Sequence, residues 1–96
     1  MNPLFLEVIY PFYEGGSDDH PIVLNMNEVV SVTLVKANPA IREQHGEWVG
    51  EILTTQMTLY VSMATMTRIA VESGDKKLDT TDPFDVFLVW CNMFMD

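Results

Sequence analysis

The sequence predicts one α+β domain over residues 1–96, with a mostly antiparallel sheet of four to six strands and one C-terminal helix packed on it. Three observations predict this class. Short apolar runs rich in strand-forming residues recur between residues 4 and 63, and some of them alternate with polar residues. Turn-forming Gly, Pro, Asn and Asp separate these runs. A helix-start signal precedes the almost wholly apolar segment 83–95.

The first third of the chain predicts three strands. Residues 4–10 form a short apolar run that ends at a proline, and residues 11–21 form an exposed loop rich in Gly and Asp. Residues 22–24 are a second short strand, and the Asn-containing segment 25–27 suits a turn or a bulge. Residues 30–35 then alternate between two sides, which is typical of a strand with one buried face.

The middle of the chain predicts a loop and then the clearest strand. Residues 36–50 are the longest irregular stretch, in which Pro39 could begin a short helical turn. Trp48 lies in this stretch between two glycines, and the pattern leaves open whether its ring enters the core or projects as an interface anchor. Residues 52–63 alternate most regularly, with Thr, Ser, Gln and Tyr on the polar side, as in a half-solvated antiparallel sheet.

Segment 64–72 allows two interpretations. Ser62 could cap a helix that ends near a glycine, but the alternating β-branched residues disfavour a helix. We favour a strand at 66–72, followed by a Gly-containing hairpin turn and a short strand at 76–80.

The C-terminal segment predicts a helix over residues 83–95. Thr81 or Asp82 serves as its N-cap, Pro83 occupies the first helical position, and Asp85 lies near the positive end of the helix dipole. A buried strand is the competing interpretation, because the segment is rich in Phe, Val and Trp.

This predicted helix is apolar on all sides. It is therefore either the hub of the core, or it packs one face on the sheet and another on a second subunit. A small sheet cannot easily cover so much apolar surface, so we expect self-association, as a homodimer. The candidate residues for this contact are Val86, Val89, Trp90 and Met93.

Two stretches resemble a known layout. Residues 22–32, Ile-Val-Leu-Asn-Met-Asn-Glu-Val-Val-Ser-Val, are similar to the strand–Asn turn–strand opening of small FlbD-type proteins. Residues 68–78 and the following 82–88 resemble the Gly hairpin and closing helix of those proteins. Similar layouts recur in small phage proteins of unknown role. The resemblance covers about a third of the chain and implies a small sheet with a C-terminal helix.

Composition and charge exclude several classes of protein. Lys and Arg number 5 against 14 Asp and Glu, for a formal charge of −9, so the chain lacks the cations that direct nucleic-acid binding requires. The single cysteine cannot form an internal disulfide, and no apolar run reaches the length of a membrane span. A lone cysteine without a secretory signal at the N-terminus predicts a cytoplasmic protein.

Three groups of residues could bind a metal ion or take part in catalysis, but a role in a loop or in the core explains each of them better. Asp18-Asp19-His20 could ligate a metal ion, but three adjacent residues in a loop rarely converge, so we expect a solvated turn and no metal. Glu43, His45 and Glu47 could surround an acid–base histidine, but a polar loop is the simpler interpretation. Cys91 has apolar neighbours, so we expect a packed thiol whose pKa burial raises.

These observations predict a non-enzymatic protein-binding module without a cofactor. Trp48 and a rim of carboxylates would form the binding surface, because such a rim attracts a basic groove on a partner. The rim residues are Glu72, Asp75, Asp79, Asp82 and Asp85. One form of this hypothesis is a small acidic inhibitor of the phage anti-defence kind, which occupies the basic site of a nucleic-acid-handling enzyme.

Two alternatives remain open at this point. An oligomeric nucleotide binder would hold phosphates with basic side chains. Those side chains would be Lys36, Arg42, Arg68, Lys76 and Lys77. A small hydrolase would use His20 or His45 with nearby carboxylates.

Overall fold

The structure, a computed structural model, describes residues 4–9 and 19–95 and confirms the α+β class. The described strands are β1 (Leu4–Ile9), β2 (Asp19–Leu24), β3 (Val29–Lys36), β4 (Trp48–Thr54) and β5 (Thr58–Ser62). The described helices are the 3₁₀-helix η1 (Met26–Glu28) and the α-helices α1 (Pro39–His45), α2 (Met63–Glu72) and α3 (Pro83–Met95). The predicted helical turn at Pro39 and the predicted C-terminal helix are both present, so the competing strand at 83–95 is excluded.

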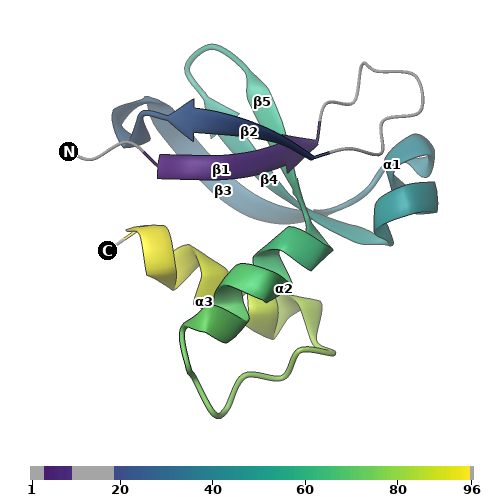
Figure 1. The fold of residues 1–96 in the computed structure, drawn as a ribbon. Coiled ribbons are helices and arrows are strands. Elements are labelled where there is room, and N and C mark those ends of the chain that lie inside the picture. The colour runs from purple at the N-terminus through teal and green to yellow at the C-terminus, as the bar shows by residue number, and fades with distance from the viewer. Residues whose placement is uncertain (1–3, 10–18, 96) are drawn as a thin grey trace.

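The strands form one antiparallel sheet in the order β2-β1-β5-β4-β3 (Figure 1). β3, β4 and β5 form a continuous meander, with Val32 opposite Ile52 and Ile52 opposite Leu59. Among the described residues, the antiparallel β1–β2 pair joins this meander where Ile9 of β1 lies opposite Tyr60 of β5. β2 and β3 are therefore the two edges of the described sheet, although only η1 separates them along the chain.

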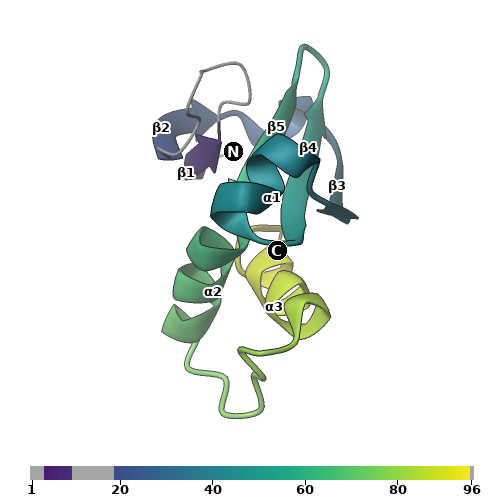
Figure 2. The same ribbon diagram turned by 90° about the vertical axis from the view of Figure 1, so that its right-hand side faces the viewer.

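The two faces of the sheet carry two separate apolar clusters. Helices α2 and α3 lie side by side on one face, with α2 below the β1 side and α3 below the β3 side (Figure 2). The larger cluster lies between these helices and the sheet, and it includes Val8, Ile52, Met66 and Trp90. The smaller cluster lies on the other face, where Ile9 and Val49 pack against Ile41 of α1. Consecutive residues such as Val8 and Ile9 separate in this way because strand side chains alternate.

Two predictions for the middle of the chain need correction. The predicted strand over residues 52–63 is two strands and the start of a helix, because the chain turns at 55–57. Thr54 fixes this turn, since its Oγ1 accepts a hydrogen bond from the Met57 N–H at 3.0 Å and donates one to the Met57 carbonyl at 2.8 Å. Trp48, predicted to lie in a loop, is the first residue of β4.

The prediction of strands at 66–72 and 76–80 is wrong. The first segment belongs to α2, and the second lies in the irregular connection between α2 and α3. The buried Ser62 hydroxyl caps α2, accepting from the Thr65 N–H at 3.1 Å and donating to Thr65 Oγ1 at 3.0 Å. Packing favours a helix over a strand at residues 66–72, because Met66 and Ala70, one helical turn apart, are both fully buried. Gly74, expected in a hairpin, lies just beyond the end of α2 with φ at 75°.

Helix α3 packs on the sheet through Val86 and Trp90, whose side chains are 0% and 1% exposed. These two residues are therefore wrongly predicted as a self-association surface, because the monomer already buries them. Gly50 of β4 makes the close approach possible. A Cβ on this glycine would lie 3.0 Å from Met66 Sδ and 3.5 Å from Trp90 Cζ3.

Replacing Ser62 by Ala is expected to lower the free energy of unfolding by about 0.5–2 kcal/mol, because α2 loses its cap. Urea denaturation monitored by circular dichroism measures the change. Thr58→Ala, on the exposed surface of β5, is the control and should shift stability by less than about 0.5 kcal/mol. Equal stability of Ser62→Ala and the native chain would contradict the cap assignment.

Replacing Gly50 by Ala is expected to cost about 1–3 kcal/mol, because the added methyl group overpacks the contact with Met66. A double-mutant cycle with Met66→Ala isolates this contact. The penalty of Gly50→Ala should shrink once the Met66 side chain is truncated. An unchanged penalty in the Met66→Ala background would show that the strain lies elsewhere.

Candidate interaction surface

The connection between α2 and α3, residues 73–82, is organised by its own carboxylates. Asp75 Oδ1 accepts a hydrogen bond from the Lys77 N–H at 2.9 Å, and Asp82 Oδ1 accepts one from the Phe84 N–H at 3.0 Å. Asp85 Oδ2, in the first turn of α3, accepts from the Asp79 N–H at 2.7 Å. Carboxylates that accept from nearby backbone N–H groups stabilise turns, so the acids shape this segment as well as charging it.

Asp79 is the most strongly bonded of these acids. Its Oδ1 accepts from the Thr81 hydroxyl at 2.6 Å and from the Thr81 N–H at 2.9 Å. Both bonds favour the ionised carboxylate, and they lower the pKa of Asp79 below its usual value. The carboxylate is therefore held in place and kept charged.

The predicted acidic rim is present as an acidic connection rather than as a hairpin. Glu72, Asp75, Asp79 and Asp82 are exposed, and Asp85 is half-buried. These residues stay close in space because α2 and α3 pack side by side and the short connection joins their ends (Figure 1). The positive charges of Lys76 and Lys77 lie within the same connection.

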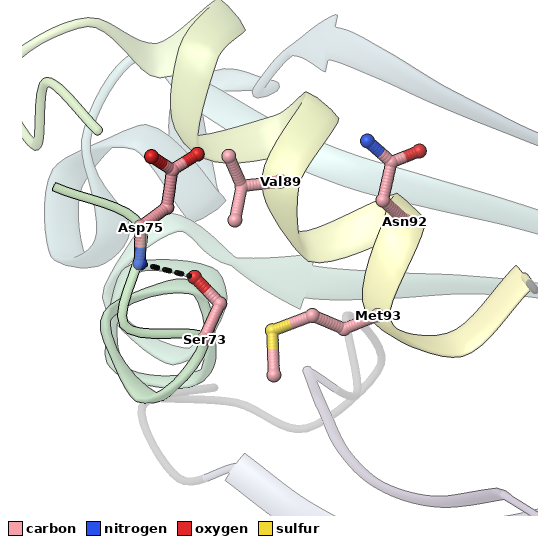
Figure 3. A pocket seen from close by; sticks show the side chains of 5 residues that line it. All are labelled: Ser73, Asp75, Val89, Asn92 and Met93. Atoms are coloured by element: carbon pink, nitrogen blue, oxygen red, sulfur yellow. Dashed lines mark hydrogen bonds between the residues drawn. The ribbon is translucent and has the colours of Figure 1, made fainter. Parts of the chain in front are cut away.

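A shallow hollow of about 470 Å³ lies between the end of α2 and the second half of α3 (Figure 3). Its lining residues are Ser73, Asp75, Val89, Asn92 and Met93. The Asp75 N–H donates to Ser73 Oγ at 3.2 Å on one side, and Met93 faces them from α3. The hollow thus combines a carboxylate and polar groups with apolar side chains, which suits a cation on an aliphatic stem.

The structure brings together two sets of residues that the sequence analysis treated separately. Asp75 was predicted for partner binding, and Val89 and Met93 for self-association, yet all three line the same hollow. Ser73 and Asn92 were missed as lining residues. Asn92 could have been found from its spacing, because positions 84, 88 and 92 share the side of a helix opposite to 86 and 90. Ser73 offers no such signal, since its place depends on where α2 ends.

Trp48 lies at the other end of α3 and is half-buried. Its ring packs edge-on against Phe84, with the ring centroids 5.2 Å apart, and Lys36 Nζ lies 5.8 Å from the Trp48 ring. Phe84 and Leu88, one turn apart on α3, are 54% and 59% exposed. The uncovered side of α3 is therefore formed by Phe84 and Leu88 instead of Val86 and Trp90.

The predicted arrangement of carboxylates around His45 is not formed. His45 lies in the last turn of α1, while Glu47 follows the helix and pairs with Lys36 at 3.6 Å, so Glu43, His45 and Glu47 do not share one extended side. Asp18 lies outside the described residues, and His20 follows Asp19 within β2. No group of three His, Cys, Asp or Glu among residues 4–9 and 19–95 could hold a metal ion.

The Cys91 thiol and two of the candidate phosphate-binding cations lie in surroundings that disfavour the chemistry considered for them. Burial raises the pKa of Cys91 to about 11, so its thiol stays protonated at neutral pH. Arg68 pairs with Glu7 at 3.3 Å, and Lys36 pairs with Glu47. Both cations are thus engaged with acids at separate places, Arg68 on α2 and Lys36 at the end of β3, an arrangement that disfavours a shared phosphate site. No helix in the described part of the chain is long and apolar enough to cross a bilayer.

Comparison of the chain with models of known protein families, with curated proteins and with solved structures finds no match. The Gly hairpin in the resemblance to FlbD-type proteins is not formed, because residues 68–72 are helical.

The Asp79 carboxyl is expected to titrate below an ordinary aspartate, and Thr81→Val should raise its pKa because the hydroxyl donor is lost. Carbon-detected NMR titration of the side-chain carboxyls measures both values. The stabilising contribution of Asp79 is present above its unfolded pKa and is lost as the pH falls through the lowered folded pKa. Thr80→Val is the control and should leave the Asp79 titration unchanged. A normal Asp79 pKa in the native chain would contradict the bonding described above.

Proposed function

We propose that this protein is a non-enzymatic binding module that receives a basic segment of a partner protein at the α2–α3 connection. The observation that carries the proposal is the hollow that exposed Asp75, from the connection after α2, lines together with Val89 and Met93 of α3. A lysine or arginine side chain could lay its aliphatic stem on Met93 and place its cation beside Asp75.

The charge distribution supports this choice of partner. The chain carries a formal charge of −9, and five acids against two lysines lie between residues 72 and 85. A field of this sign raises the association rate of a positively charged partner and falls with ionic strength. A basic site on a nucleic-acid-handling enzyme has the required charge, so an inhibitory role at such a site is the specific form of the proposal.

The fixed geometry of the acids also favours binding. Hydrogen bonds from Lys77 and Thr81 hold Asp75 and Asp79 in place before any partner arrives. A pre-ordered carboxylate loses less conformational freedom when it pairs with a cation, which improves affinity without new contacts.

The partner can be identified by co-purification from the native host, and affinity for it then tests the surface. Asp75→Asn is expected to weaken binding about twofold to fivefold, as for an ion pair at an exposed rim. Met93→Ala should weaken it further, since Met93 is 42% exposed and lines the same hollow as Asp75. Glu43→Gln removes an exposed acid on α1 and is the control for charge alone.

Salt provides an independent readout, because the Debye length falls from about 10 Å at 0.1 M to about 3 Å at 1 M. Binding by the native chain should weaken as salt rises, and binding by Asp75→Asn should weaken less steeply. Affinity that is independent of salt, or equal effects of Asp75→Asn and Glu43→Gln, would overturn the proposed surface.

A further inference from the structure

A small cavity lies on the face of the sheet opposite to α2 and α3, beside α1, which packs on β4 (Figure 2). Its volume is about 160 Å³. Val35, Ile41 and Val49, which belong to or pack against the smaller apolar cluster, form much of its lining. Glu51 and Tyr60 add a carboxylate and a phenol ring to this apolar surface. We call it the Glu51 cavity.

The two polar residues of the Glu51 cavity are positioned by the sheet. Glu51 lies in β4, directly opposite Thr33 of β3 on one side and Tyr60 of β5 on the other. Partial burial, the negative charge of Glu51 and a hydrogen bond to its carboxylate raise the pKa of Tyr60, so the hydroxyl remains a donor at neutral pH. A half-buried carboxylate held between two neighbouring strands loses little conformational freedom when it binds a ligand.

The charge of Glu51 is available to a ligand. Lys36 also borders the cavity, but its Nζ pairs with Glu47 Oε1 at 3.6 Å. Arg42 of α1 donates from Nη2 to the main-chain carbonyl of Ala37 at 3.4 Å. Neither of the ion pairs found among residues 4–9 and 19–95 includes Glu51. A cation that enters the cavity would therefore meet a carboxylate that no basic side chain already neutralises.

We propose that the Glu51 cavity binds a small alkylammonium group, with the Glu51 carboxylate as its counter-ion and the Tyr60 ring beside its charge. The carboxylate selects a cation, and the aromatic ring adds a cation–π attraction. The apolar lining favours an organic cation over a metal ion, because a metal ion requires several oxygen or nitrogen ligands. In the part of the chain that the structure describes, no three acidic, His or Cys side chains gather to provide them.

The size of the cavity limits the ligand. A volume of 160 Å³ holds about five heavy atoms, if each takes the roughly 30 Å³ that a water molecule occupies in the liquid. This is the size of n-butylammonium, which has four carbons and one nitrogen. The lysine side chain ends in the same group, so a free amine and a lysine of another protein share the chemistry that this cavity recognises.

Titration of the ¹⁵N-labelled full chain with n-butylammonium, followed by NMR, tests the site. Saturable shifts are expected at Val49, Glu51 and Tyr60. n-Butanol, a neutral molecule of the same size, should bind at least about tenfold more weakly because it cannot pair with the carboxylate. Glu51→Gln keeps the shape of the side chain and should raise the Kd for n-butylammonium at least about fivefold. Glu43→Gln removes an exposed acid of α1 and is the matched control.

Two further measurements identify the source of the ligand and separate this site from the α2–α3 surface. Nα-acetyl-lysine amide that binds as tightly as n-butylammonium would support a protein lysine as the ligand, and tenfold weaker binding would support a free amine. Asp75→Asn should leave the shifts at Val49 and Tyr60 unchanged, so this site can fail or succeed independently of the partner surface.

The comparison of n-butylammonium with n-butanol uses the native chain, so it tests the site even if Glu51→Gln fails to fold, which thermal unfolding would reveal. The proposal is overturned if the native chain shows no saturable shifts at the cavity, or if n-butanol binds as tightly as n-butylammonium. A folded Glu51→Gln variant with the same Kd as Glu43→Gln would overturn it as well.

Discussion

The contact between α3 and the sheet determines which side chains of the helix reach the surface. Trp90 and Val86 enter the core beside Gly50, the one position in the centre of the meander without a side chain to obstruct them. Burial of these side chains fixes the rotation of α3 about its axis. Phe84 and Leu88 must then lie on the uncovered side, while Val89 and Met93 border the hollow beside the end of α2. Burial of Val86 and Trp90 thus determines which other side chains of α3 are exposed.

The acidic connection follows from the same packing. Because α2 and α3 lie side by side, the chain must reverse direction between residues 72 and 83. Asp75, Asp79 and Asp82 supply the acceptors for backbone N–H groups in that reversal. The same carboxylates remain at the surface, so one set of residues both shapes the connection and gives it its negative charge. The negative charges of these carboxylates therefore lie together at the α2–α3 connection, whereas β3 carries a charged residue only at its end, Lys36.

The proposed function uses the acidic connection. The α2–α3 connection offers a carboxylate beside apolar side chains and suits a basic partner, which salt would release. This surface uses neither His45 nor Cys91, and the raised pKa of the Cys91 thiol is consistent with a packing role for that side chain.

Elements whose signals are local could be predicted from the order of the residues alone. The period of two over residues 30–35, and the Asp82-Pro83 start of α3, predict their elements because strand alternation and helix capping act within a few residues. Segment 66–72 depends instead on long-range packing, because burial of Met66 and Ala70 against the sheet outweighs the strand preference of their β-branched neighbours. Long-range packing also determines which side of α3 is exposed and which residues surround the hollow. Those outcomes depend on contacts between segments far apart in the chain, which no local pattern contains.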